Sequence, residues 1–234
     1  MPEIIPTNTC PKDLAELAER SRAFAAYAPQ VQLDVCDGSF VPAISWPYGA
    51  GQWDELVRMT QVGEKLPHAE AVRYEAHLMI ESPRACGELL AQVGVPRIMG
   101  HFEASGSIDN ARETLRAWRE SGAREVGLAL LIDTPLERVE PLIAELDCVL
   151  LMSIEKLGAQ GAAFQPRIYE RIRQLHAAHP SLTVAIDGGV SEQNIAELAR
   201  AGASRFGVGS AISKAADPKK AYETLFSLAI HTQD

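Results

Sequence analysis

The sequence predicts an α/β fold, specifically a (β/α)8 (TIM) barrel, and three observations lead to this prediction. Eight short strand-like runs alternate with helical patterns along the chain, as repeated βα units require. Runs such as Leu128 to Ile132 are almost continuously apolar, which is typical of parallel strands covered on both faces. No Pro-rich, Ser/Gly-rich or charged block interrupts the alternation, so we expect residues 1–234 to form one barrel domain.

The expected strands are short and rich in β-branched and other apolar residues. They run over Glu3 to Pro6, Val31 to Val35, Val72 to Leu78, Arg97 to His101, Glu125 to Leu131, Cys148 to Ile154, Thr183 to Ile186 and Arg205 to Val208. A closed barrel would bring the carboxyl ends of all eight strands to one mouth.

Helical patterns with identifiable ends separate these strands. Ile168, Ile172 and Leu175 are spaced four and three apart, so a helix over about 166–179 would place them on one face. Capping residues and prolines predict the ends of other helices. Two helices are expected to begin at Ser82-Pro83 and Thr134-Pro135. Another is expected to begin with Ser191 as its N-cap and to end at Ala201-Gly202, and the last helix to have Pro218 in its first turn.

Composition and charge exclude several classes of protein. Apolar residues make up 47% of the chain and charged residues 23%, as in soluble globular proteins with a large core. A net charge of -9 disfavours nucleic acid and anionic membranes as partners. The chain has no long apolar run and its start lacks the pattern of a secretion signal, so we expect a cytoplasmic protein.

Four scattered cysteines, without CxxC spacing, predict neither a zinc knuckle nor a disulfide framework.

Polar side chains stand at the ends of three expected strands. Asp34 ends the second, His77 lies near the end of the third, and Asp187 ends the seventh, directly before Gly188-Gly189. An acidic residue at a strand end followed by glycines is how a barrel presents a catalytic group beside a phosphate-sized hole. The sequence therefore predicts a site built from two carboxylates and an imidazole. His101 and Glu103, near the fourth strand, fit either a hydrogen-bonded polar layer or a catalytic role.

The ordered motifs at the strand ends resemble those of the ribulose-phosphate 3-epimerase family. They are Asp34-Val35-Cys36-Asp37-Gly38 with Val41-Pro42, His77-Leu78-Met79, His101-Phe102-Glu103-Ala104, Gly127-Leu128-Ala129-Leu130 with Thr134-Pro135, Asp187-Gly188-Gly189-Val190 with Asn194, and Gly207-Val208-Gly209-Ser210-Ala211-Ile212. The resemblance covers nearly the whole chain, from Ile5 to Ile212. It implies an isomerase of the pentose phosphate pathway that inverts C3 of a ketose phosphate, with D-ribulose 5-phosphate to D-xylulose 5-phosphate as the leading reaction. We also expect the protein to assemble as a homo-oligomer.

The resemblance also implies roles for individual residues. Asp34 and Asp187 would be the catalytic acid and base on opposite faces of the substrate, passing through an enediolate stabilised by a metal. His77, Asp34 and Asp187 would bind that divalent ion, which is zinc, iron or manganese in the family. The family places a histidine where this chain has Gln32, so Gln32 is expected to be a weak ligand and the metal to be loosely bound or absent.

For the sugar phosphate, the resemblance implies contacts from the glycines that follow the seventh and eighth strands. Gly188, Gly189, Gly209 and Ser210 would donate backbone N–H groups to the phosphate. Met79 and Met152 would lie beside the reacting carbons, although plain core packing is an equal alternative for both. The family's glycine-rich loop after the sixth strand is only partly kept here, in the segment from Glu155 to Phe164.

Two other functions remain open from the sequence. A degenerate, non-catalytic member of the fold would bind a sugar phosphate or a partner without turnover, consistent with the change at Gln32. An aldolase would use Lys156, near the end of the sixth strand, as a Schiff-base lysine, although Glu155 beside it argues against the lowered pKa that this chemistry needs.

Overall fold

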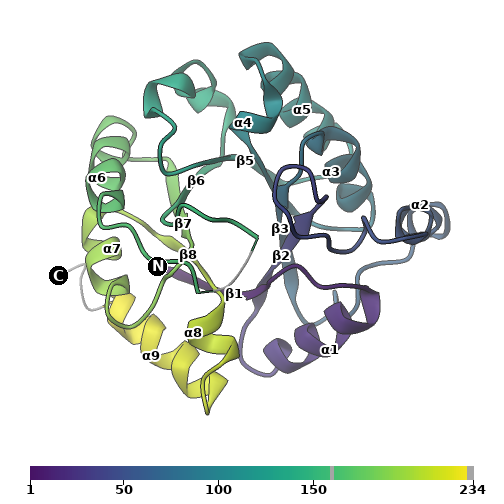
Figure 1. The fold of residues 1–234 in the computed structure, drawn as a ribbon, viewed down its shortest axis with the longest axis horizontal. Helices are drawn as coiled ribbons and strands as arrows, with labels where there is room; N and C mark the ends of the chain where they lie inside the picture. The colour runs from purple at the N-terminus through teal and green to yellow at the C-terminus, as the bar shows by residue number, and fades with distance from the viewer. Residues whose placement is uncertain (159–160, 231–234) are drawn as a thin grey trace.

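The structure is a computed structural model that describes residues 1–158 and 161–230. Within these residues eight parallel strands close into a barrel in the order β1-β2-β3-β4-β5-β6-β7-β8, with β8 pairing back onto β1 (Figure 1). The strands are β1 (Glu3–Asn8), β2 (Gln30–Cys36), β3 (Arg73–Met79), β4 (Arg97–His101), β5 (Glu125–Leu130), β6 (Cys148–Met152), β7 (Thr183–Asp187) and β8 (Arg205–Val208). The predicted (β/α)8 barrel is confirmed.

Helices form a ring around the strands (Figure 1). They are α1 (Leu14–Ala25), α2 (Gln52–Val62), α3 (Pro83–Gln92), α4 (Phe102–Ser105), α5 (Ile108–Glu120), α6 (Ile168–Ala178), α7 (Ile195–Ala201), α8 (Ser210–Ser213) and α9 (Pro218–Ile230), with 3-10 helices η1 (Leu136–Arg138) and η2 (Glu140–Glu145). No helix in the described part of the chain is long and apolar enough to cross a membrane.

Two predicted helix starts are wrong in detail. Thr134-Pro135 begins two short 3-10 helices rather than an α-helix, and Thr134 itself is drawn inward because its hydroxyl donates to Glu103. The N-cap of α7 is Asn194, not Ser191, because a turn intervenes. The Asn194 side chain accepts a hydrogen bond from the Ser191 N–H at 2.9 Å, which stabilises that turn instead of starting the helix.

The strands are buried on both faces, as their apolar composition predicts. All seven residues of β2 are buried, including the polar Gln30, Gln32 and Asp34. Side chains on the outer face of the barrel, such as Leu33 and Val35, pack against the helices in the main core. Gln32 and Asp34 alternate with them, so these polar groups point into the barrel.

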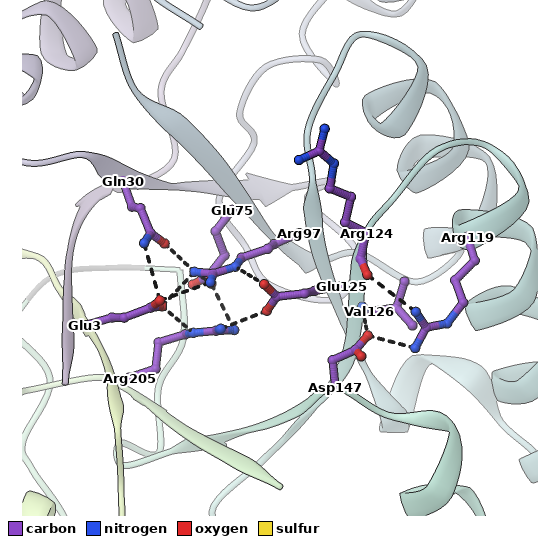
Figure 2. A network of polar contacts seen from close by, with 10 residues as sticks. All are labelled: Glu3, Gln30, Glu75, Arg97, Arg119, Arg124, Glu125, Val126, Asp147 and Arg205. Atoms are coloured by element: carbon purple, nitrogen blue, oxygen red, sulfur yellow. Dashed lines mark hydrogen bonds and ion pairs between the residues drawn. The ribbon is translucent and has the colours of Figure 1, made fainter. Parts of the chain in front are cut away.

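A polar cluster fills the barrel at the amino-terminal ends of the strands (Figure 2). We call it the basal network; its members are Glu3, Gln30, Glu75, Arg97, Glu125 and Arg205. Each comes from a different strand, so the cluster exists only when the barrel closes. The predicted site residues Asp34, His77 and Asp187 lie at the opposite end of the barrel, near the carboxyl ends of their strands.

Candidate active site

Three predicted residues meet at the carboxyl ends of β2, β3 and β7. Asp34 lies directly across from His77 in the register of β2 with β3. The His77 Nδ1 atom is 3.2 Å from Oδ2 of Asp187 and 3.5 Å from Oδ1 of Asp34. His77 is fully buried, whereas the Asp187 side chain keeps 14% exposure toward the barrel mouth. The barrel therefore brings together the two carboxylates and the imidazole that were far apart in the sequence.

Burial and charge compete at this cluster. Burial opposes a charged imidazole at His77, but the two neighbouring carboxylates outweigh it and raise the pKa of His77 to about 10. For Asp34, burial is the largest influence and raises its pKa; the charge of Asp187 acts in the same direction, while His77 opposes both. The two carboxylates thus favour the charged form of His77.

Gln32 lies between the two aspartates. Its Nε2 group donates to Oδ1 of Asp34 at 2.8 Å and to Oδ2 of Asp187 at 2.7 Å. Its Oε1 atom is buried without a hydrogen-bond partner among the described residues and lies 2.9 Å from the place of a Cβ on Gly207. In this orientation the amide is a donor to the carboxylates. A role as metal ligand requires the amide to turn so that Oε1 faces them, and the weak-ligand assignment stays a prediction.

The donor set fits a divalent metal ion. Asp34, His77 and Asp187 offer ligand atoms that all lie within 4.8 Å of one another. The Nδ1 of His77 is buried and faces both carboxylates, so once it has lost its proton it is placed to be a ligand atom. One imidazole and two carboxylates are a ligand set that zinc, iron and manganese accept, and three protein ligands leave a position open for substrate.

Behind His77 lies a chain of hydrogen bonds that holds its ring. Nε2 of His77 is 3.0 Å from Nε2 of His101, and Nδ1 of His101 is 3.3 Å from Oε2 of Glu103. Glu103 is fixed in turn by the Leu131 N–H at 2.9 Å and by the Thr134 hydroxyl. Burial lowers the pKa of His101 to about 4. His101 and Glu103 are therefore the polar layer that the sequence allowed, and they orient His77 through its second nitrogen.

A cavity of about 110 Å³ opens above the cluster. Its lining includes all the predicted site residues except Gln32: Asp34, His77, Met79, Met152, Asp187, Gly188, Gly189, Gly209 and Ser210. Thr7 and Thr9, from the end of β1, also line it. They were missed in the sequence because no chemical motif marks them, although their place at a strand's carboxyl end was a usable signal.

The loop after β6 closes one side of this cavity. Leu157, Gly158, Gly161 and Ala162 line it, while residues 159 and 160 lie outside the described residues. Lys156 is exposed and is not part of the lining. A Schiff-base lysine must reach the substrate from a site that lowers its pKa, so the aldolase assignment has no structural support.

A barrel with an acidic, metal-competent cluster at its carboxyl-terminal mouth defines the class: a TIM-barrel enzyme. The chain belongs to the ribulose-phosphate 3 epimerase family, which it matches over residues 5–213, and this family places it among the isomerases. It is 33% identical to the ribulose-phosphate 3-epimerase, cytoplasmic isoform, of Oryza sativa subsp. japonica, over 91% of this chain and 88% of the relative. It is also 33% identical to ribulose-phosphate 3-epimerase 1 of Cupriavidus necator, over 91% and 85%.

Solved structures share the fold at low sequence identity. KGPDC from Streptococcus mutans has a TM-score of 0.69 at 11% identity, covering 100% of this chain and 100% of that chain. The 3-hexulose-6-phosphate synthase of Salmonella typhimurium has a TM-score of 0.67 at 16% identity, covering 98% and 99%. At such identities these similarities establish the barrel alone.

Proposed function

We propose that the protein epimerises a ketose phosphate at C3, with D-ribulose 5-phosphate to D-xylulose 5-phosphate as the leading reaction. The observation that carries this proposal is the pair Asp34 and Asp187, which face one buried imidazole at the floor of a single cavity. Inversion at a carbon next to a ketone needs one group to remove a proton and another to return one from the opposite face. Family membership supports the same reaction.

In this proposal the two aspartates exchange roles with the direction of reaction. One carboxylate accepts the C3 proton, which leaves an enediolate, and the other carboxyl donates a proton to the opposite face. Burial raises the pKa of Asp34, which moves this carboxyl in the direction that a proton donor needs. The Gln32 amide holds both carboxylates by donating to each. When bound by Asp34, His77 and Asp187, a zinc, iron or manganese ion would stabilise negative charge on the substrate oxygens.

The phosphate is assigned to the glycine side of the cavity. Gly188 and Gly189 have φ values of +100° and +70°, so consecutive backbone N–H groups can turn toward an anion there. Gly209 and Ser210 lie at the start of α8 on the same cavity. Met79 and Met152 would contact the sugar carbons with polarisable, apolar side chains.

The proposal extends to the protein's setting. Residues 1–234 are proposed to act as one domain, assembled as a homo-oligomer in the cytoplasm, with a small sugar phosphate as the ligand. The rice relative is named as a cytoplasmic isoform. The net charge of -9 argues against nucleic acid as a partner.

The test is proton exchange at C3 in deuterated water, followed by mass spectrometry of ribulose 5-phosphate. We expect Asp34→Asn or Asp187→Asn to lower exchange by about 10²- to 10⁴-fold, because each removes a general acid or base. Asp37→Asn is a matched control, because Asp37 lies near the mouth but its carboxylate accepts from the backbone of Ser39 and Glu81. Near wild-type exchange in Asp187→Asn would remove that residue from the mechanism.

One observation favours a second candidate, a non-catalytic protein that binds a sugar phosphate. Gln32 already satisfies both carboxylates with a neutral amide, so the cluster has a partner without any metal. Such a protein would bind ribulose 5-phosphate in calorimetry while wild-type exchange stayed at the level of buffer. Measurable exchange that disappears in the aspartate variants would exclude it.

A further inference from the structure

Two cysteines from neighbouring strands meet beside the cavity. Cys10 follows β1 and Cys36 ends β2, and their Sγ atoms are 2.7 Å apart although the residues are 26 positions apart in the chain. Both are free thiols. Because a disulfide has an S–S distance of about 2.05 Å, the sulfurs need to approach by only about 0.6 Å to bond.

The backbone holds these two sulfurs in place. Cys36 donates its N–H to Oγ of Ser45 at 2.9 Å, and its carbonyl accepts from the Ser45 N–H at 3.0 Å. The next residue, Trp46, donates its N–H to the carbonyl of Pro11 at 2.8 Å. The segments that carry Cys10 and Cys36 are thus tied to the same two residues, 45 and 46. The pairing is a property of the folded chain rather than of two mobile side chains.

The two sulfurs differ in access to solvent. Cys36 is fully buried, as are Cys86 and Cys148, whereas Cys10 is partly exposed. Cys10 also has a φ of +40°, an unusual value for a residue with a side chain. In this backbone conformation its sulfur contacts that of Cys36. We propose that Cys10 and Cys36 are a reversible dithiol–disulfide site, in which Cys10 reacts with a peroxide, Cys36 resolves it, and bond formation releases the loop at Gly158.

The chemistry balances with a peroxide as oxidant and a dithiol as reductant. The Cys10 thiol gives up its proton as its sulfur attacks one oxygen of hydrogen peroxide, and the O–O bond breaks. Cys10 becomes a sulfenic acid, and the hydroxide that leaves takes up the thiol proton to form water. The Cys36 sulfur then attacks the Cys10 sulfur, the S–O bond breaks, and a second water leaves with the Cys36 proton. An external dithiol reverses the reaction by exchange and is itself oxidised to a disulfide.

The site is connected to the cavity through one hydrogen bond. Cys10 Sγ donates to the carbonyl of Gly158 at 3.8 Å, and Gly158 lines the cavity. A disulfide has no S–H, so oxidation removes this contact between the loop and the β1 segment. Lys156, two residues earlier in the loop, is exposed and offers a trypsin site that reports on the loop without any enzyme assay.

The test is peptide mapping of the full chain after one equivalent of hydrogen peroxide. We expect a peptide linked through Cys10 and Cys36 that dithiothreitol separates. Cys148→Ala is the matched control, because it removes a buried thiol at the other end of the barrel and should leave the link intact. Cys36→Ser should leave a Cys10 sulfenic acid that dimedone traps, and Cys10→Ser should leave Cys36 unoxidised.

Two results would overturn the proposal. Wild-type protein in which Cys10 advances to sulfinic acid with no link to Cys36 would show that the pair does not resolve. We expect trypsin to cleave after Lys156 about twofold to tenfold faster in the oxidised protein, in keeping with the loss of one hydrogen bond. Equal cleavage in the reduced and oxidised proteins would show that the cysteine pair is not coupled to the loop. Neither readout depends on epimerase activity.

Discussion

Gln32 decides how the acidic cluster is held together. Two buried carboxylates in one cluster repel each other, and a cation or hydrogen-bond donors must compensate. Here the Gln32 amide donates to both, and the charge of His77 adds to it. The amide's own oxygen is left without a partner among the described residues. A residue that satisfies the aspartates by donation is poorly suited to bind a metal at the same time.

We therefore expect Gln32→His to raise metal affinity, because an imidazole nitrogen can join Asp34, His77 and Asp187 as a fourth ligand. The expected gain is about tenfold or more, the scale on which ligand-sphere changes act, and the epimerase rate should rise with it. Metal content by mass spectrometry and turnover of ribulose 5-phosphate measure the two effects.

Gln92→His is the control for this variant, because it makes the same chemical change at an exposed position at the end of α3. Wild-type protein that is already fully loaded with metal, and gains nothing from Gln32→His, would show that the amide turns and ligates. If metal content rises but turnover does not, the partly kept loop after β6 would be the cause of low activity with this substrate.

At the scale of elements, the packing of α3 against α5 depends on a glycine. Gly87 lies in the middle of α3, and a Cβ there would come within 2.1 Å of Nε1 of Trp118 on α5. Trp118 is buried, and its Nε1 donates to the carbonyl of Arg84. The close approach of the two helices thus has its cause in a missing side chain.

We expect Gly87→Ala to destabilise the protein by about 1–2 kcal/mol, because overpacking against a fixed indole costs up to about 3 kcal/mol and the gain in helix propensity returns only about 1 kcal/mol. Urea unfolding followed by circular dichroism measures the change. Glu88→Ala, at the neighbouring position of the same helix, should stay within about 0.5 kcal/mol of wild type. A Gly87→Ala protein as stable as wild type would mean that Trp118 moves aside freely.

The sequence was informative where one local pattern decides the structure. Apolar runs located the strands, and carboxylates at strand ends located Asp34 and Asp187. It could not reveal contacts that form only on closure of the barrel, such as the sulfur pair of Cys10 and Cys36. Nor could it reveal that Gln32 turns its nitrogen toward the aspartates, because an amide offers a donor and an acceptor alike.

For the molecule as a whole, closure of the barrel buries charge at the end opposite the site. In the basal network, Glu75 is 2% exposed and lies 3.5 Å from Arg205 and 3.8 Å from Arg97 (Figure 2). Its Oε2 makes no hydrogen bond to a described residue, so the ion pairs compensate its burial incompletely. Burial is the largest influence and raises the pKa of Glu75 to about 7. Glu3 differs: burial is opposed by Arg97 and Arg205, which lower its pKa to about 2.

These shifts predict opposite effects of pH on stability. The folded chain holds the Glu75 proton more tightly than the unfolded chain, whose pKa is the ordinary 4.5, so this residue's contribution is full below pH 4.5 and is lost as the pH rises to about 7. The loss is at most about 3 kcal/mol. The contribution of Glu3 changes only between pH 2 and 4.5, where stability rises with pH, so the two windows do not overlap.

Glu75→Gln isolates this effect, because glutamine resembles the protonated acid and every other titrating group is common to both proteins. We expect the variant to match wild type at about pH 4 and to be more stable than wild type at about pH 8, where Glu75 is ionised when folded. Urea unfolding at the two pH values measures the difference, and Glu81→Gln, at an exposed position after β3, is the control that should follow wild type at both. A Glu75→Gln protein that loses stability at about pH 8 would mean that the ion pairs with Arg97 and Arg205 outweigh the burial of Glu75, and that the basal network stabilises the barrel by its charge.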